Sequence, residues 1–179
     1  MRFFKLGFFW CVLLIIILGV AMQGNAQNYQ LHAVYIYSFT RYIQWPENDN
    51  SEFIIGVLGK DSEVIPHLEK MAEVKKVNNK QIQIEVFDSP SMISKCDMLF
   101  LDKEWSTDNE FVDEWVEKAR SNHFLLLTNE QPLTGLSHIN FTEDNNKLIF
   151  ELNRKRIESS GLRVSTELLA LAKIVDYQE

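Results

Sequence analysis

The run Phe53-Ile54-Ile55-Gly56-Val57-Leu58 is short, continuous and apolar, and it decides the fold class. Two further runs have the same character, Met98-Leu99-Phe100-Leu101 and Phe124-Leu125-Leu126-Leu127. Such runs are typical of strands buried on both faces, which occur in parallel sheets covered by helices. The segment Ile82-Gln83-Ile84-Glu85-Val86 alternates between apolar and polar residues, as expected of a half-buried strand nearer an edge.

Helical patterns lie between the apolar runs, over residues 62–73 and 108–120. Asp61 and Asp108 stand beside their starts as candidate N-terminal caps. Alternation of strand and helix predicts parallel strands joined by right-handed crossovers. The predicted fold class is therefore α/β: a single-domain, three-layer, doubly wound and mostly parallel sheet with flanking helices.

An amphipathic helix precedes the first apolar run. Its apolar positions recur at helical spacing and predict one buried face. The residues of that face are Leu31, Val34, Tyr35, Ser38, Phe39, Tyr42 and Ile43. The helix should end before Trp45-Pro46, because the residue before a proline is pushed out of the helical region.

Ile36 and Tyr37 lie off the predicted buried face of this helix. We predict that Tyr37 and Tyr29 contact a dimer mate or another partner, since interfaces favour such residues.

The last third of the chain has a different pattern. Ile139-Asn140-Phe141 and residues 148–152 flank a polar segment, which predicts an antiparallel hairpin added to the sheet. Gly161 separates a short helical piece from a final helix capped by Ser165 or Thr166. The predicted apolar face of that final helix is Val164, Leu168, Leu171, Ala172 and Val175.

The N-terminus has the three parts of a secretory signal. Arg2 and Lys5 form a basic start, residues 6–22 are continuously apolar, and Gly24 and Ala26 occupy the small-residue positions of a cleavage site. We expect a protein exported from the cytoplasm.

Two outcomes of export stay open. Cleavage after about Ala26 divides the chain into a signal peptide over residues 1–26 and one α/β domain over residues 27–179. Retention would leave the apolar run as a membrane anchor, although it is slightly shorter than the roughly 20 residues of a spanning helix. We expect cleavage.

Composition excludes some partners and one source of stability. The formal net charge is −7, which argues against nucleic acid as a binding partner, because nucleic-acid binding requires a basic surface.

After cleavage Cys96 is the only cysteine, so no internal disulfide can form. We predict a buried, inert thiol at the start of a strand. An intermolecular disulfide or a ligand contact is the alternative.

Motifs of catalysis are missing from the chain. There is no Gly-x-Ser-x-Gly elbow, no His-Glu-x-x-His helix and no P-loop. Gly56 and Gly59 do not form a dinucleotide motif; a close packing contact and a strand-end turn explain them. The four histidines are not at metal-ligand spacing from one another or from Cys96. We predict no enzyme activity, no metal and no cofactor.

One location is suited to a ligand. Ligands of open α/β sheets bind at the carboxyl ends of the strands, where this chain carries Lys60, Asp61, Asp102 and Asn129. These four residues define a candidate small-molecule pocket. The alternative is that they are polar loop residues of the kind that cap helices.

The chain resembles the YfiR/HmsC family of periplasmic regulators from about Tyr29 to Lys173. Four blocks carry the resemblance: AVYIYSFTRYIQWP at 33–46, FIIGVLG at 53–59, CDMLFL at 96–101, and the group INF at 139–141, FELN at 150–153 and GLRVSTELLALA at 161–172. The family positions that look structural are Trp45, Pro46, Gly56, Cys96, Asn153 and Gly161.

The resemblance implies a non-enzymatic periplasmic protein. Studied members of the family look like dimeric periplasmic inhibitors of a membrane-bound diguanylate cyclase. By this inhibition they restrain cyclic-di-GMP signalling and biofilm formation. An outer-membrane lipoprotein can sequester such an inhibitor, and similar domains occur as sensor modules of histidine kinases. This chain departs from the better-known members because Cys96 has no partner for an internal disulfide.

Two functions therefore stand as hypotheses. The first is a periplasmic regulator, expected to be a homodimer, that binds a membrane diguanylate cyclase or histidine kinase. The second is a periplasmic small-molecule sensor that uses the pocket at the strand ends.

Overall fold

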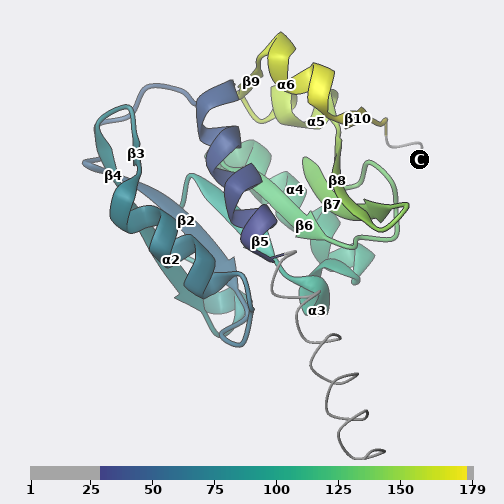
Figure 1. Ribbon diagram of the computed structural model, residues 1–179, viewed down its shortest axis with the longest axis horizontal. Helices are drawn as coiled ribbons and strands as arrows, with labels where there is room; N and C mark the ends of the chain where they lie inside the picture. The colour runs from purple at the N-terminus through teal and green to yellow at the C-terminus, as the bar shows by residue number, and fades with distance from the viewer. Residues whose placement is uncertain (1–28, 177–179) are drawn as a thin grey trace, which may run out of the picture.

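A computed structural model of the chain describes residues 29–176 (Figure 1). Within this range eight strands form one sheet in the order β10-β8-β7-β6-β5-β2-β4-β3. The strands are β2 Glu52–Leu58, β3 Lys76–Val77, β4 Lys80–Phe87, β5 Met98–Leu101, β6 Leu125–Asn129, β7 Ile139–Asp144, β8 Lys147–Leu152 and β10 Lys173–Ile174.

The sheet is mostly parallel. β4, β2, β5, β6 and β7 pair in parallel in that order, and β10 is parallel to β8. β7–β8 and β3–β4 are antiparallel pairs. A second, two-stranded sheet joins β1 (Ile43–Gln44) to β9 (Arg163–Val164). The predicted α/β architecture with an antiparallel C-terminal hairpin is confirmed.

Helices cover both faces of the sheet. They are α2 Ile65–Val74, α3 Lys103–Ser106, α4 Asn109–Asn122, α5 Arg154–Ser159 and α6 Thr166–Leu171. Residues 29–42 are also helical and are called the N-terminal helix below. Figure 1 shows the N-terminal helix and α2 in front of the sheet and α4 behind it. Two separate apolar cores result.

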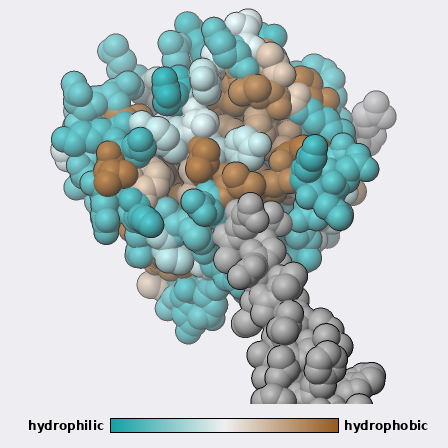
Figure 2. Space-filling view, viewed as in Figure 1, coloured by the Kyte–Doolittle hydropathy of each residue, from teal (hydrophilic) through white to brown (hydrophobic). Residues whose placement is uncertain are grey.

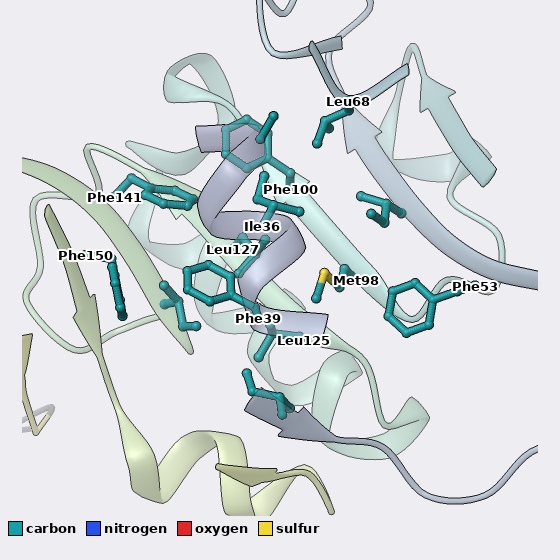
Figure 3. Packing of buried hydrophobic residues seen from close by; sticks show 14 of the residues in the cluster. Ile36, Phe39, Phe53, Leu68, Met98, Phe100, Leu125, Leu127, Phe141 and Phe150 are labelled. Atoms are coloured by element: carbon teal, nitrogen blue, oxygen red, sulfur yellow. The ribbon is translucent and has the colours of Figure 1, made fainter. Parts of the chain in front are cut away.

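The larger core lies beneath the N-terminal helix (Figure 3). Phe39 projects between Phe141 and Phe150, with ring centroids 5.9 and 5.1 Å away. Ile36, one helical turn earlier, is fully buried beside Phe100. Edge-to-face and offset aromatic contacts of this kind add to the stabilisation from apolar burial.

This packing corrects the predicted helix face. The spacing predicts Leu31 and Val34 on the buried face, yet they are 40% and 54% exposed. It predicts Ile36 off that face, yet Ile36 is fully buried. The residues that turn inward are His32, Ala33, Ile36, Phe39, Thr40 and Ile43. The spacing was helical, but a helix apolar over most of its circumference does not reveal which side meets the sheet.

The smaller core lies on the opposite face, beneath α4. Val112, Trp115 and Val116 of α4 pack over β5 and β6. Gly56 allows this layer to close, because a Cβ at this position would lie 2.9 Å from Cε2 of Phe87. The predicted close packing contact at Gly56 is confirmed. Cys96 is buried in the same core, as expected.

Local signals fixed several element ends. The Asp108 carboxylate accepts a hydrogen bond from Phe111 N and caps α4, and Ser165 caps α6 through Leu168 N. Asn145 and Asn146 adopt positive φ angles in the β7–β8 turn, where asparagine is tolerated. These predictions are confirmed.

Two other local predictions were wrong. Asp61 does not cap α2: the N-cap residue is Val64, without a side-chain hydrogen bond, so the helix begins later than expected. The final helix does not continue to Val175. It ends at Leu171, and Lys173–Ile174 form β10 beside β8. The unpaired edge of β8 offered backbone hydrogen bonds that outweighed local helix propensity.

The predicted signal peptide over residues 1–26 lies outside the described residues. Among residues 29–176 there is no helix of the length and apolarity needed to span a bilayer.

Candidate functional site

The structure brings together two of the four residues predicted to line a strand-end pocket. Asn129 Nδ2 donates to Asp102 Oδ1 at 3.1 Å. The Asp102 carboxylate also accepts from Lys103 N at 2.7 Å and from Ser62 Oγ, and it caps α3. Asp102 therefore caps the start of α3. This is the role expected under the alternative interpretation, in which these residues cap helices and do not line a pocket.

A small cleft of about 260 Å³ lies beside this pair. Its lining residues are Tyr29, His32, Glu63, Lys103, Asn129, Glu130, Thr142, Glu143 and Leu148. Of the predicted pocket residues Asn129 contributes to it, whereas Lys60, Asp61 and Asp102 are not among the lining. Lys60 and Asp61 are exposed in the turn that follows β2.

Charged and aromatic groups surround the cleft. Lys103 Nζ lies 2.5 Å from Glu130 Oε2 at its rim. Burial and the negative charge of Asp102 raise the pKa of Tyr29 to about 12, so the phenol stays protonated. The Tyr29 ring stacks on His32 with centroids 5.3 Å apart, and His32 Nε2 lies 3.2 Å from Asn129 Oδ1. The sequence did not point to His32, because it lies at no metal-ligand spacing from another histidine or from Cys96.

A polar row, buried except at its end on β10, crosses the sheet next to this region. Thr128, Asn140, Glu151 and Lys173 stand directly opposite one another on β6, β7, β8 and β10. Hydrogen bonds of 3.1, 3.3 and 2.9 Å join them in that order. Asn140 and Glu151 interrupt the apolar hairpin strands, which is visible in the sequence. Which residues they pair with depends on the register of the strands.

A larger cleft of about 1280 Å³ opens at the other end of the sheet. Trp45 lies in it, and its Nε1 donates to the carbonyl oxygen of Asp97 at 2.9 Å. Arg41, Lys76 and Arg163 add positive charge to the lining. Burial raises the pKa of the Asp97 carboxyl, although its Oδ2 accepts from Ile54 N at 2.8 Å. The sequence did not predict this cleft.

Within residues 29–176 there is no cluster of three or more His, Cys, Asp or Glu side chains that could hold a metal ion.

A family model described as YfiR/HmsC-like matches residues 29–173, which is most of the chain. The chain belongs to the YfiR/HmsC-like family. This family is one of periplasmic regulators. A comparison with curated proteins found no match.

Positions shared with the YfiR/HmsC-like pattern have structural roles here. Asn153 is buried and caps α5 through Arg156 N, while its Nδ2 donates to Gly135 O at 2.7 Å. Gly161 has φ +78° and contacts His123 so closely that a Cβ would lie 2.9 Å from Nδ1. These contacts give Asn153 and Gly161 a role in the local structure around α5.

Apolar patches lie among hydrophilic residues on the face of this YfiR/HmsC-like domain that Figure 2 shows. Leu31 and Val34 of the N-terminal helix are exposed, and Leu171 and Ile174 near the C-terminus are 68% and 50% exposed. Figure 2 shows apolar residues gathered over the N-terminal helix and the C-terminal elements. We call these four residues the apolar surface.

The predicted partner residues Tyr29 and Tyr37 are both half-buried. Tyr29 lies at the small cleft, and Tyr37 packs against the larger core with Lys75 Nζ 5.4 Å from its ring centroid. The large apolar residues of this helix that are exposed are Leu31 and Val34, which the spacing predicts to be in the core.

Proposed function

We propose that this chain is a periplasmic regulatory binding protein that inhibits a membrane-bound diguanylate cyclase. It would thereby restrain cyclic-di-GMP signalling and biofilm formation. Membership of the YfiR/HmsC-like family supports the regulatory role. The observation that carries partner binding is the apolar surface of Leu31, Val34, Leu171 and Ile174. Exposed apolar residues that gather on one face mark interaction sites, since their contact with water is unfavourable.

The geometry of the apolar surface favours a helical partner. Leu31 and Val34 are three residues apart and so lie on the same side of their helix. Side chains at this spacing form a ridge that packs into the groove of another helix. A membrane signalling enzyme presents such helices where its periplasmic segment meets its membrane spans. The same surface would serve a histidine kinase, which is the other partner that the family suggests.

The test is capture of the partner from native membranes. The chain is expressed from residue 1, recovered as the cell processes it, cross-linked to membranes and identified by mass spectrometry. We expect a membrane diguanylate cyclase, and we expect added protein to reduce cyclic-di-GMP synthesis by those membranes. Capture of a histidine kinase instead would contradict the cyclase assignment.

Matched variants locate the contact. Val34→Asp and Leu171→Asp should abolish capture and relieve inhibition, because each places a charge on the apolar surface. Val74→Asp is the control, since Val74 is 74% exposed on α2, outside that surface. Equal loss in all three variants, or in none, would contradict this surface as the docking site.

A second candidate function is small-molecule sensing at the strand ends. The small cleft between Tyr29, His32 and Asn129 supports it, because polar groups converge there around an open volume. Thermal unfolding with a panel of small polar metabolites is the measurement. A ligand at 100 times its dissociation constant adds about 2.7 kcal/mol to stability. Asn129→Ala should remove that gain, and an unchanged melting temperature across the panel would argue against sensing.

A further inference from the structure

The small cleft lies where the winding of the sheet changes direction. β2 has β4 on one side and β5 on the other. Figure 1 shows α2, which follows β2, in front of the sheet and α4, which comes after β5, behind it. Loops that diverge in this way open a crevice at the carboxyl ends of the strands, where ligands of open α/β sheets bind. Glu63 comes after β2 and Lys103 after β5, and both line the small cleft.

Two of the lining side chains are polar and almost completely buried. His32 is 3% exposed and Asn129 is 6% exposed. Hydrogen bonds hold both in place, because His32 Nε2 lies 3.2 Å from Asn129 Oδ1 and Asn129 Nδ2 donates to Asp102 Oδ1. The Tyr29 ring stacks on His32 at the same place. An aromatic wall and a few converging polar groups beside an open volume are typical of a small-molecule site.

Carboxylates dominate the charge around the cleft. Glu63, Glu130 and Glu143 line it, and Lys103 is the one lysine or arginine among the lining residues that the structure describes. Burial raises the pKa of Tyr29 to about 12, and the negative charges of surrounding carboxylates, Glu63 and Glu130 among them, add to this effect. Carboxylates on different loops therefore act together on the position of the Tyr29 hydroxyl.

An ammonium group already contacts one of these carboxylates. Lys103 Nζ lies 2.5 Å from Glu130 Oε2, and the two side chains are 61% and 48% exposed. Ion pairs this exposed are weak, because water competes with both groups and the long side chains lose freedom when they pair. The Lys103 ammonium can therefore give way to the ammonium of a ligand.

We propose that the small cleft binds a small organic ammonium ion. Glu63 and Glu130 would attract its charge, while Tyr29 and Leu148 of the lining would contact its carbon skeleton. The volume of about 260 Å³ requires a compact ligand, since most ligand pockets measure roughly 300–1,000 Å³. The same carboxylates would repel an anion. The inference rests on small-molecule sensing, the second candidate function, and names the chemical class of its ligand.

Three probes with the same four-carbon skeleton test the charge class. Butane-1,4-diamine is a cation at neutral pH, butane-1,4-diol is uncharged and succinate is an anion. In isothermal titration calorimetry with the chain expressed from residue 1, we expect only the diamine to bind. Its affinity should fall as salt is added, because salt screens exposed charges.

Two negative results of this titration have different meanings. Binding of the diol or of succinate, lost in Asn129→Ala, without binding of the diamine would overturn the ammonium class and leave sensing at the cleft intact. Failure of all three probes to bind would overturn the present proposal, and the metabolite panel would then decide sensing separately.

Charge variants locate the bound ion. Glu63→Gln should weaken diamine binding at least roughly threefold, since it removes an attractive charge from the lining. Lys103→Gln should strengthen binding, because the competing ammonium beside Glu130 is lost, whereas a purely structural role of Lys103 predicts no gain. The matched control is Glu69→Gln, exposed on α2 and outside the cleft lining, which should keep the parent affinity.

All three substituted side chains are exposed, and thermal unfolding checks that the variants fold. Equal diamine affinities of Glu63→Gln and Glu69→Gln, or no gain in Lys103→Gln, would overturn the proposal.

Discussion

Asn140 on β7 and Glu151 on β8 face each other across the hairpin, and Asn140 Nδ2 donates to Glu151 Oε2 at 3.3 Å. Both side chains are buried, and Asn140 Oδ1 also accepts from Gln131 N at 3.0 Å. The Asn140 amide therefore forms hydrogen bonds with the Glu151 carboxylate and with the backbone of Gln131 at the same time. A buried polar group without a partner costs about 1–3 kcal/mol.

Asn140→Ala should lower the free energy of unfolding by about 2–3 kcal/mol, because Glu151 Oε2 and the backbone of Gln131 each lose a hydrogen bond. Urea denaturation measures the change. Asn109→Ala is the control, since Asn109 is exposed at the start of α4 and should change stability by less than about 0.5 kcal/mol. Equal effects of the two substitutions would contradict a structural role for the polar row.

Gly161→Ala should destabilise the domain by about 1–3 kcal/mol, since φ is +78° and the new Cβ would meet Nδ1 of His123 at 2.9 Å. Gly59→Ala separates the two causes. Its φ is +111°, but the nearest atom lies 3.6 Å away, so only the backbone cost applies. The melting temperature should therefore fall further for Gly161→Ala, and adding His123→Ala should recover part of the difference.

Stability should fall in acid because of His138. Its Nδ1 accepts from Leu126 N at 3.1 Å and its Nε2 lies 3.1 Å from Ser160 Oγ, so both nitrogens are already used in the neutral ring. Burial lowers the pKa of His138 to about 3, whereas the unfolded chain titrates at about 6.5.

Below pH 6.5 the unfolded state therefore binds a proton that the native state does not. The free energy of unfolding should drop by about 1.4 kcal/mol per pH unit from this residue until pH approaches 3. Urea titrations between pH 7 and 4 measure the slope. His138→Gln should flatten it, whereas His67→Gln, on α2, should not. An unchanged slope in His138→Gln would show that other groups cause the loss.

Cys96 should resist thiol reagents in the native protein. Burial raises the pKa of this thiol to about 12, and the thiolate is the reactive form. Labelling with iodoacetamide at pH 8 should be slow without denaturant and fast in urea. Rapid native labelling, or a Cys96-linked dimer on a non-reducing gel, would contradict the buried position and support the intermolecular disulfide that the sequence left open.

Trp45→Phe should cost about 1 kcal/mol, because it removes the hydrogen bond to Asp97 O while keeping a ring against Phe53. Trp45→Ala should cost more, but less than the roughly 3–5 kcal/mol typical of a fully buried tryptophan, since Trp45 is half-exposed. Guanidinium denaturation measures both. Identical values for the two variants would show that the hydrogen bond, and not the ring, carries the contribution.

Local patterns in the sequence determined the layers of this protein. Continuous apolar runs marked β2, β5 and β6, because a strand buried on both faces has no polar side. The alternation in β4 placed it near an edge, and the caps at Asp108 and Ser165 marked helix starts by satisfying orphan backbone N–H groups. The family blocks identified the same fold before any contact was known.

Only the tertiary structure decided which side of the N-terminal helix is buried. Apolar residues surround most of that helix, so the spacing favours Val34 as a core residue, whereas packing against the sheet buries Ile36 instead. The same holds for β10, whose strand conformation depends on the open edge of β8. The row from Thr128 to Lys173 and the pairing of Asp102 with Asn129 likewise exist only in three dimensions, because each joins residues from different strands or loops whose register no local pattern encodes.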